Sequence, residues 1–263
     1  MLAMQRGSGM RVLGVCVLLL PLLGCSQAAR QPDCAALSHE VHDPAAPVNR
    51  TVFAFNRVVD EYLMQPVARG YARLPQPVQD GVHNFSANFS EPKVLVNDVL
   101  QGNGQRAMNT VGRFTLNTLL GVAGVFDTAG RMGLPHHEAD FGQTFGVWGI
   151  GAGPVLEWPL LGSANSRDSV GRVANFLFSP FGDNSDTVAT IGTVETVGST
   201  VDQRAAALPL TERLQAEADY YAALRDQIAE TRARRVAEGK AGQVDSTGLF
   251  SGCELKEQGD GQP

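Results

Sequence analysis

DFGQTFGVWGIGAGPVLEWPLLG, residues 140–162, is the segment from which the architecture of this chain is best inferred. From Phe141 to Leu156 it carries no charged side chain, and glycines stand at positions 142, 146, 149 and 153. These spacings place the glycines on one face of a helix, where they let a neighbouring helix approach closely, as is common inside membranes. Because Gly149–Pro154 is rich in helix breakers, we predict a helix of about three turns. A bent, apolar, extended segment should follow and end at Pro159.

The alternative for this segment is an ordinary glycine-rich loop in a protein core. A second uncharged run, Phe114–Phe126, favours a membrane setting. As a helix it would cover about 20 Å, whereas a hydrocarbon core is about 30 Å thick. Neither run can cross a bilayer, but each fits within one leaflet, and we predict no transmembrane helix in the mature chain. The candidate membrane-embedded or lipid-path residues are Phe114, Leu119, Phe126, Phe141, Gly142, Phe145, Gly146, Trp148, Gly149 and Gly153.

The first residues have the pattern of an export signal. Arg6 and Arg11 supply positive charge, and Val12–Leu20 is apolar but too short to span a bilayer. Gly24 before Cys25 is the arrangement that a bacterial lipoprotein peptidase needs, so we predict a signal peptide at 1–24 and acylation of Cys25. Nothing after Cys25 retains the product at the inner membrane. The alternative is a plain secretory signal with an accidental cysteine.

Charge and cysteine content limit the partners. The formal net charge is −6, and loss of Arg6 and Arg11 with the signal makes it more negative. Nucleic acid and anionic membrane surfaces are therefore poor partners, and membrane contact must come from apolar area and acyl chains. Cys34 and Cys253 form a possible disulfide in an oxidising periplasm, although both lie in polar segments and two free thiols remain an alternative.

The remaining pattern is mainly α. Residues 25–42 are a polar tether, 43–237 a single helical domain and 238–263 a disordered tail. The best strand signal is Val155–Leu161. The predicted helices are Asn49–Leu63 ended by Pro66, Val78–Phe89, one opened by Glu91-Pro92 and closed by Gly102, Gln105–Phe126, Asn165–Phe178 capped by Ser166 and stopped by Pro180, Asp186–Leu208, and Thr211–Ala237 capped by Thr211.

Several asparagines lie inside apolar helical patterns, and their role has two interpretations. They make hydrogen bonds between helices or cap them, or they line a wet interior that is surrounded by apolar outer faces. The candidates for a polar lining are Asn56, Asn88, Asn97 and Asn117, and Asn84 has the same kind of surroundings.

Catalytic and metal signals are weak. His136 and His137 are adjacent, follow Pro135 and have no third histidine at ligand spacing, so we predict a solvated loop and no metal. His83 is isolated and reads as a surface or capping residue. The glycines of Gly149–Gly153 lack the strand, helix and lysine of a phosphate loop, and no G-x-S-x-G motif occurs. We predict that the chain is not an enzyme and has no cofactor.

Taken together, the chain from Asp43 to about Leu208 resembles the MlaA/VacJ family of outer-membrane lipoproteins. One departure follows Asp43-Pro44, where Ala46, Pro47 and Val48 replace the usual glutamate, glycine and phenylalanine. The matching residues are Asn49-Arg50 with Phe53 and Phe55-Asn56; Pro66-Val67; Pro75-Gln76-Pro77-Val78; Asn84-Phe85 and Asn88-Phe89; Glu91-Pro92 with Asn97-Asp98 and Leu100-Gln101-Gly102; Arg113-Phe114 with Asn117-Thr118; Gly121 through Asp127; Phe141-Gly142-Gln143-Thr144 through Gly153-Pro154; and Pro159 with Gly162, Arg167 and Asp168.

The resemblance implies a ring-shaped helical body that lies in the periplasmic leaflet of the outer membrane, with a polar-lined pore and an apolar outer belt. It implies binding to trimeric porins and removal of phospholipid misplaced in the outer leaflet. That phospholipid would pass to a soluble periplasmic carrier of the Mla type and then to an ATP-driven inner-membrane complex. No bond is made or broken in this transfer.

Two other functions remain as alternatives at this point. One is a lipid-anchored periplasmic hydrolase that uses His83 or His136. The other is a structural scaffold that only clusters porins.

Overall fold

The computed structural model describes residues 41–177 and 186–245, all of which belong to the unit Gln31–Pro263. The predictions for the signal peptide, Cys25, Cys34, Pro180 and Cys253 lie outside the described residues, as does most of the tether and of the tail. The described part is mainly α, as predicted. Its elements are α1 Ala46–Val59, the π-helical turn η2 Asp60–Met64, α2 Gln65–Tyr71, α3 Gln76–Leu100, α4 Gly104–Leu119, α5 Thr128–Arg131, α6 Phe141–Val147, β1 Val155–Trp158, β2 Gly162–Asn165, α7 Ser166–Leu177, α8 Asp186–Ala206, α9 Leu208–Leu214 and α10 Tyr220–Ala241.

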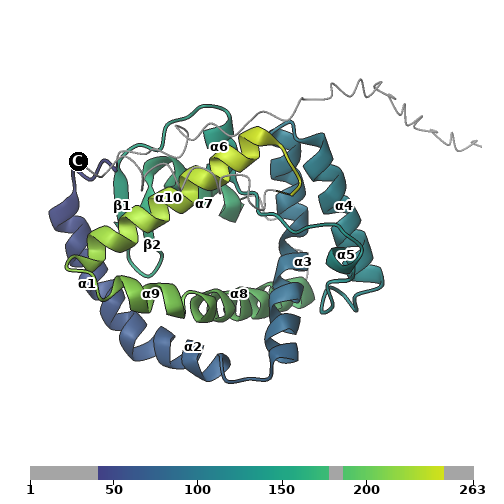
Figure 1. Cartoon of the computed structure of the whole chain (residues 1–263), viewed down its shortest axis with the longest axis horizontal. Coiled ribbons are helices and arrows are strands. Elements are labelled where there is room, and N and C mark those ends of the chain that lie inside the picture. The colour runs from purple at the N-terminus through teal and green to yellow at the C-terminus, as the bar shows by residue number, and fades with distance from the viewer. Residues whose placement is uncertain (1–40, 178–185, 246–263) are drawn as a thin grey trace, which may run out of the picture. The chain divides into compact units, whose positions relative to one another are not determined.

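Contacts between these elements close a circuit (Figure 1). From α1 the chain runs through η2 into α2, which packs on α8, and α8 packs on α3. Helix α3 contacts both α4 and α6, α6 packs on α7, and α7 contacts the β1–β2 hairpin, which returns to α1. Helix α10 runs across α6 and β2 and meets α9 (Figure 1). Segments far apart in the sequence therefore hold one another in place.

The prediction that Pro66 ends the first helix is wrong. Helical backbone continues from α1 through η2 into α2, and Pro66 is the second residue of α2. Pro66 has no N–H to donate, so one helical hydrogen bond is missing where the π-helical turn meets α2. The π-helical turn makes this possible, since the N–H of Gln65 donates to the carbonyl of Asp60, five residues back.

The predicted break before Glu91-Pro92 is also absent. Helix α3 runs through Pro92 without interruption, although proline removes one helical hydrogen bond. Glu91, Asn97 and Asp98 of this helix are buried. Packing of α3 against both α4 and α8 overrides the local preference.

The uncharged run Phe114–Phe126 is not one helix, which corrects a third prediction. Helix α4 ends at Leu119, and Val122, Ala123 and Gly124 all have positive φ, at 54°, 55° and 96°. A Cβ atom on Gly121 would lie 2.2 Å from the carbonyl oxygen of Phe126, so only glycine fits where the chain folds back. The run is therefore a helix end followed by a tight turn.

Helix ends differ from the predictions in three further places. Helix α6 has only about two turns and stops before Gly149, whose φ is 91°. Helix α7 is capped by Asn165 rather than Ser166, since its side-chain oxygen accepts the N–H of Asp168 at 2.8 Å. The predicted helix at 211–237 is divided into α9 and α10, and Asp219 caps α10. Thr211 lies inside α9.

The strand prediction was right in place but incomplete. β1 ends at Trp158 and pairs antiparallel with β2, with Val155 opposite Asn165 and Trp158 opposite Gly162. The sequence Gly162–Asn165 lacks the β-branched and aromatic residues that mark strands, so pairing with β1 alone makes it a strand. At the other end, α10 continues to Ala241, past the predicted domain boundary at residue 237.

The close approach predicted for the glycines of α6 is confirmed at two positions. A Cβ on Gly171 of α7 would lie 2.4 Å from the backbone nitrogen of Gly142, so these helices touch through their backbones. A Cβ on Gly146 would lie 2.6 Å from a methyl carbon of Val236 in α10. Helix α6 is therefore held between α7 and α10 by residues that have no side chain.

We expect Gly171→Ala to loosen the α6–α7 contact, because the new methyl group would overlap the backbone of Gly142 and not a flexible side chain. Overpacking of this kind costs about 1–3 kcal/mol. The melting temperature should fall by roughly 2–4 °C for each kcal/mol, which thermal melts followed by circular dichroism measure. Gly70→Ala in α2 is the matched control, since its Cβ would meet nothing within 4 Å. A wild-type melting temperature for Gly171→Ala would contradict this account of the contact.

Candidate functional site

The buried interior of the described part is polar. Its largest fully buried side chains are Arg106, Gln143, Glu91, Asn97, Asn117, Thr110, Thr144 and Asp98. In soluble proteins these positions are usually held by large apolar residues, and charged residues are rarely buried. The interior of this chain is therefore the reverse of an ordinary core.

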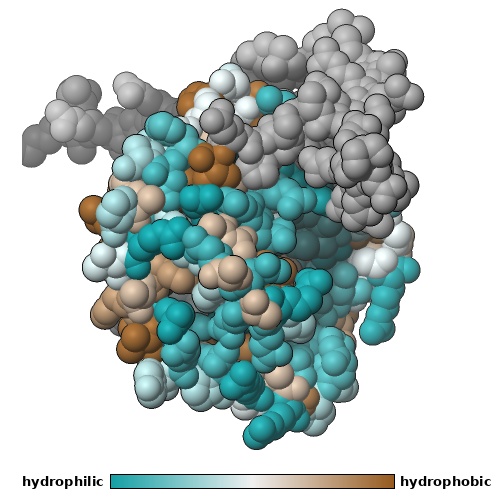
Figure 2. All heavy atoms as spheres, turned by 60° about the vertical axis from the view of Figure 1, so that its left-hand side comes forward, coloured by the Kyte–Doolittle hydropathy of each residue, from teal (hydrophilic) through white to brown (hydrophobic). Residues whose placement is uncertain are grey.

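Many large hydrophobic side chains lie on the surface. Large hydrophobic side chains are exposed on most helices, with Tyr62 81% exposed, Leu119 74% and Phe176 85%. Figure 2 shows one face of the molecule, where hydrophobic residues lie open among hydrophilic ones, mostly toward the left of the view. Extended apolar exposure on a protein indicates an interaction with a membrane or a partner. Among the described helices, none has the length and hydrophobicity needed to cross a bilayer.

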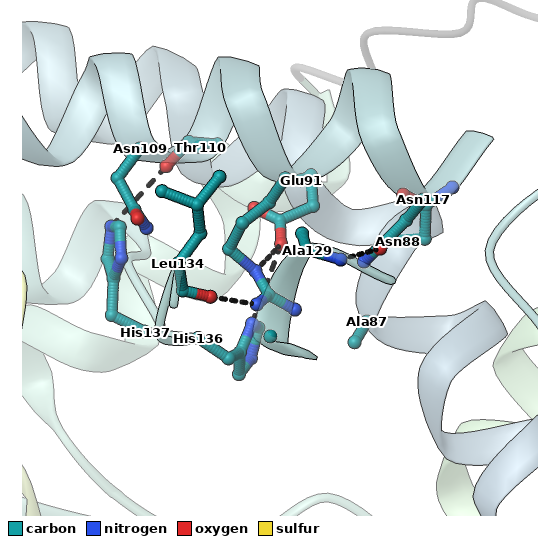
Figure 3. Close-up of polar contacts among 12 residues, drawn as sticks. Ala87, Asn88, Glu91, Asn109, Thr110, Asn117, Ala129, Leu134, His136 and His137 are labelled. Atoms are coloured by element: carbon teal, nitrogen blue, oxygen red, sulfur yellow. Dashed lines mark hydrogen bonds and ion pairs between the residues drawn. The ribbon is translucent and has the colours of Figure 1, made fainter. Parts of the chain in front are cut away.

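The centre of the interior is an ion pair between α3 and α4. The Nε of Arg113 donates to Glu91 Oε1 at 2.8 Å, and the two side chains are 3% and 1% exposed. Arg113 also donates to the carbonyl of Leu134 at 2.6 Å and to Asp127 at 3.2 Å. Figure 3 shows Glu91 and Leu134 turned toward this point, with His136 beside them. A charge pair removed from water is tolerated only when its hydrogen-bonding groups are well partnered.

Asparagines extend this cluster toward α5. The amide of Asn117 donates to Asp127 at 3.0 Å, and its oxygen accepts the N–H of Ala129 at 2.8 Å (Figure 3). Asn88 donates to the hydroxyl of Thr118 at 3.1 Å. Burial raises the pKa of Asp127, but hydrogen bonds from Gly130 and Asn117 and the charge of Arg113 outweigh it and hold that pKa below its usual value. The carboxylate therefore stays ionised.

His137 corrects the prediction of a solvated loop. It is buried, and its Nε2 lies 2.9 Å from Asp98 Oδ2, which also accepts the hydroxyl of Thr110 at 2.7 Å. Figure 3 shows His137 directed at Thr110, whereas its neighbour His136 is directed at Glu91. In the described part of the chain no group of three or more histidine, cysteine or acidic residues is placed to hold a metal ion.

A second polar group joins α3 to α6 and α10. The hydroxyl of Thr144 donates to Asn97 at 2.7 Å and accepts from Gln101 at 2.9 Å. Gln143 donates to the carbonyl of Arg235 at 2.5 Å, and Asn103 donates to that of Gly239 at 2.8 Å. The carboxyl-terminal half of α10 is therefore fixed to the interior by amide side chains.

The four predicted polar-lining residues are not in one place. Asn88, Asn97 and Asn117 are buried at the contacts of α3 and α4 just described. Asn56 lies apart on α1, where it donates to Glu157 at 2.8 Å and accepts the N–H of Leu160 at 2.7 Å, which ties the hairpin to α1. All four make hydrogen bonds within the protein, and a role in lining a pore remains a prediction.

The candidate membrane-embedded residues are also divided between the surface and the interior. Leu119, Phe126 and Trp148 are each more than half exposed. Phe114 and Phe145 are half-buried, and Gly149 and Gly153 are exposed in the loop after α6. Phe141, Gly142 and Gly146 are buried against α7 and α10, so their segment packs inside the protein.

Sequence reasoning missed the ionic cluster that fastens α10. Arg232 donates to Asp140 at 2.6 and 2.9 Å and to Asp168 at 2.8 Å, and Arg167 pairs with Asp168 at 3.0 Å. Burial raises the pKa of Asp140, but the hydrogen bonds and charge of Arg232 outweigh it and lower that pKa. The only local signal was the spacing of Asp140 and Gln143, which marks a helix cap and says nothing of Arg232.

His83 is exposed and is placed in a structural contact. Its Nδ1 lies 2.9 Å from Asp202 Oδ2, and the other oxygen of Asp202 accepts the hydroxyl of Tyr71 at 2.9 Å. Burial and the hydrogen bond to Asp202 raise the pKa of Tyr71 above its ordinary value. These three residues come from α3, α8 and α2, and they fasten α8 into the circuit.

Buried ion pairs together with many exposed large hydrophobic side chains are typical of a helical protein that contacts a membrane or a partner. Comparison with known proteins makes this specific, because the sequence model for the MlaA lipoprotein matches residues 41–235. The chain belongs to the MlaA lipoprotein family.

Individual relatives agree with this assignment. An uncharacterised protein of Rickettsia felis is 35% identical over 196 residues, which cover 73% of this chain and 77% of the relative. The intermembrane phospholipid transport system lipoprotein MlaA of Escherichia coli K12 is 41% identical over 140 residues, or 51% of this chain and 55% of the relative. A solved structure from work on the maintenance of bacterial outer membrane lipid asymmetry matches with a TM-score of 0.62 and 33% identity. The match covers 73% of this chain and 98% of that one.

We expect Arg113→Met to destabilise the fold strongly, because it leaves the carboxylate of Glu91 buried without its main partner. Breaking a buried pair in this way costs about 3–5 kcal/mol. The double variant Glu91→Leu/Arg113→Met removes both charges and should recover part of that loss. Chemical denaturation of the single and double variants gives the coupling energy. Additive losses would show that the two side chains do not stabilise each other.

We expect the contact between Asp140 and Arg232 to make the stability of the fold depend on pH in the acidic range. Because the folded pKa of Asp140 is lowered, its contribution is complete above the unfolded pKa of about 3.9 and disappears as pH falls through the lower folded value. Asp140→Asn keeps a capping side chain for α6 but removes the charge. Its melting temperature should be well below that of the wild type at pH 7, and this difference should become smaller at pH 2.5. An equal difference at both pH values would refute the assignment.

Proposed function

We propose that this chain is a phospholipid transport component of the outer membrane, which keeps the two leaflets different by removing misplaced phospholipid from the outer leaflet. Its family membership supports this, and so does the E. coli relative, whose name places it in intermembrane phospholipid transport. The observation that carries the proposal is the reversed distribution of side chains, with charged and amide groups inside and large hydrophobic groups outside.

The chemistry of lipid movement explains why this distribution is useful. A phospholipid headgroup alone in hydrocarbon loses its hydration and has no compensating hydrogen bonds, which is costly. A body with an apolar exterior sits in one leaflet, and a polar inner surface gives the headgroup partners during transfer. The closed circuit of helix contacts supports a ring-shaped body around a polar-lined pore. Moving a phospholipid in this way needs no covalent step, so the proposed function is not that of an enzyme.

The membrane setting and the partners are part of the same proposal. Acylation of Cys25 holds the protein in the periplasmic leaflet, and residues 25–42 tether it to the body at Asp43. The outer apolar surface binds a trimeric porin. A soluble periplasmic carrier of the Mla type accepts the phospholipid and passes it to an ATP-driven inner-membrane complex.

The hydrolase alternative has no specific support from the geometry. His83 is paired with Asp202 in a contact that joins α3 to α8, and His136 lies beside the buried carboxylate of Glu91 at 3.5 Å. The scaffold alternative explains the apolar surface but gives no reason for a charged interior, which is costly to maintain.

We expect deletion of the gene to raise the phospholipid content of the outer leaflet, and the wild-type chain to restore it. The variant Leu119→Lys/Leu120→Lys should restore it poorly at equal abundance, because each lysine would cost about 2.5–3.5 kcal/mol in hydrocarbon. Both positions are exposed, so folding in detergent should be unaffected. Outer-leaflet labelling of phospholipid and detergent resistance of the cells provide the measurement.

Gln105→Lys/Gln203→Lys is the matched control, since both glutamines are exposed and polar. It should complement the deletion as well as the wild type does. A deletion strain with an unchanged outer leaflet and intact detergent resistance would overturn the proposed function. Restoration by the Leu119→Lys/Leu120→Lys variant would overturn only the assignment of this surface to the membrane.

A further inference from the structure

A cavity of about 160 Å³ lies between α10 and the segment that leads into β1. One wall is apolar and comes from Ala229, Ala233 and Val236, which are four and three residues apart and so share a face of α10. Val155 of β1 contributes opposite them. A cavity of about 150 Å³ with apolar walls holds a benzene molecule, so this one has room for roughly six carbon atoms.

The other part of the lining is cationic. Arg167, Arg232, Lys240 and His42 contribute to it. Arg167 is only 7% exposed and is held at its position by Asp168, and Arg232 is held by Asp140 and Asp168. The two guanidinium groups are thus held in place at the wall of the cavity, and Asp140 and Asp168 balance their charge.

Lys240 and His42 differ from the two arginines. Within the described residues neither side chain has a hydrogen bond or an ion pair, and the ammonium group of Lys240 is exposed on the last turn of α10. The protein as a whole carries a net charge of −6. Among the described lining residues, the positive charge without a partner is therefore that of Lys240, and it is complementary to an anion.

The floor of the cavity is rigid. The N–H of Ser166 donates to the carbonyl of Pro154 at 2.9 Å, and the N–H of Arg167 donates to that of Ala152 at 3.1 Å. Gly153, which lies between Ala152 and Pro154, has a φ of 69°. A Cβ atom at this position would meet the side chain of Ser166 at 3.2 Å. The loop is thus fixed to the start of α7, and the cavity keeps its form without a ligand.

We propose that this cavity binds one phospholipid by its phosphate and by the adjoining part of an acyl chain. The phosphate contacts Lys240 and His42 near the opening, with Arg167 behind them, and the hydrocarbon lies against Ala233 and Val236. The proposal rests on the proposed function, which brings phospholipid to this protein, and it adds a specific resting place beneath α10. Charge-assisted hydrogen bonds supply the recognition of the phosphate.

The test uses the full-length lipoprotein in mixed micelles with a phosphatidylglycerol that carries a diazirine on its acyl chain. After illumination, mass spectrometry should find the label on the α10 peptide that contains Ala233 and Val236. Lys240→Glu should reduce labelling roughly tenfold, since a charge-assisted hydrogen bond is lost and repulsion replaces it. Ala233→Trp fills the cavity and should reduce labelling to a similar degree.

Matched controls keep the result interpretable. Thr231→Trp adds the same side chain to an exposed position of α10, and Arg213→Glu reverses an exposed charge on α9. Both should label as the wild type does. A thermal melt shows whether Ala233→Trp folds. If it does not, the labelling of Lys240→Glu alone tests the proposal, because Lys240 is exposed and its substitution should leave the fold intact.

Competition separates the two sources of phosphate. Unlabelled phosphatidylglycerol should displace the probe, whereas inorganic phosphate and diacylglycerol should each displace it at least about tenfold less well. Displacement by inorganic phosphate alone would reduce the site to one for free phosphate, and equal displacement by diacylglycerol would exclude recognition of the phosphate. Wild-type labelling of Lys240→Glu would also overturn the proposal. None of these results tests the transport function. That function is tested by the phospholipid content of the outer leaflet in the deletion strain.

Discussion

The buried ion pair between Glu91 and Arg113 is the contact on which this structure depends. It joins α3 to α4, and Arg113 also binds Asp127 and the carbonyl of Leu134, which lie on either side of α5. Such a pair adds little net stability compared with an apolar core, but it becomes very costly when one partner is missing. The interior therefore tolerates few rearrangements, and this favours one defined arrangement of helices even though the usual hydrophobic core is small.

The same logic applies to the attachment of α10. Arg232 reaches both Asp140, which caps α6, and Asp168, which lies in the first turn of α7. Glycines at 142, 146 and 171 allow the backbones of these helices to approach closely enough for the ionic contacts to form. A side chain at any of these glycines would separate the helices. Close packing and charge pairing thus support each other, and together they fix the wall and floor of the cavity beneath α10.

A lipid transporter contacts both hydrocarbon and water, and the distribution of residues in this chain suits both. Its exposed leucines, valines and aromatic residues suit hydrocarbon, while its buried amides and charges bind one another in the interior of the described part. The exposed hydrophobic side chains lie on long helices such as α3 and α8 as well as on shorter ones and on turns, and none of the described helices is long and apolar enough to cross a bilayer.

The sequence by itself determined the mainly helical class, the family, the absence of a crossing helix among the described residues and the close approach at Gly142 and Gly146. These features are local, because periodicity, run length and glycine spacing are written in neighbouring residues. Only the tertiary structure decided that α3 runs through Pro92, that Gly162–Asn165 is a strand and that His137 is buried on Asp98. It alone brought Arg232 to Asp140 and placed Lys240 beside Arg167. Partners of this kind are separated by tens of residues or more, and no local pattern specifies which of several arginines meets which carboxylate until packing has brought their helices together.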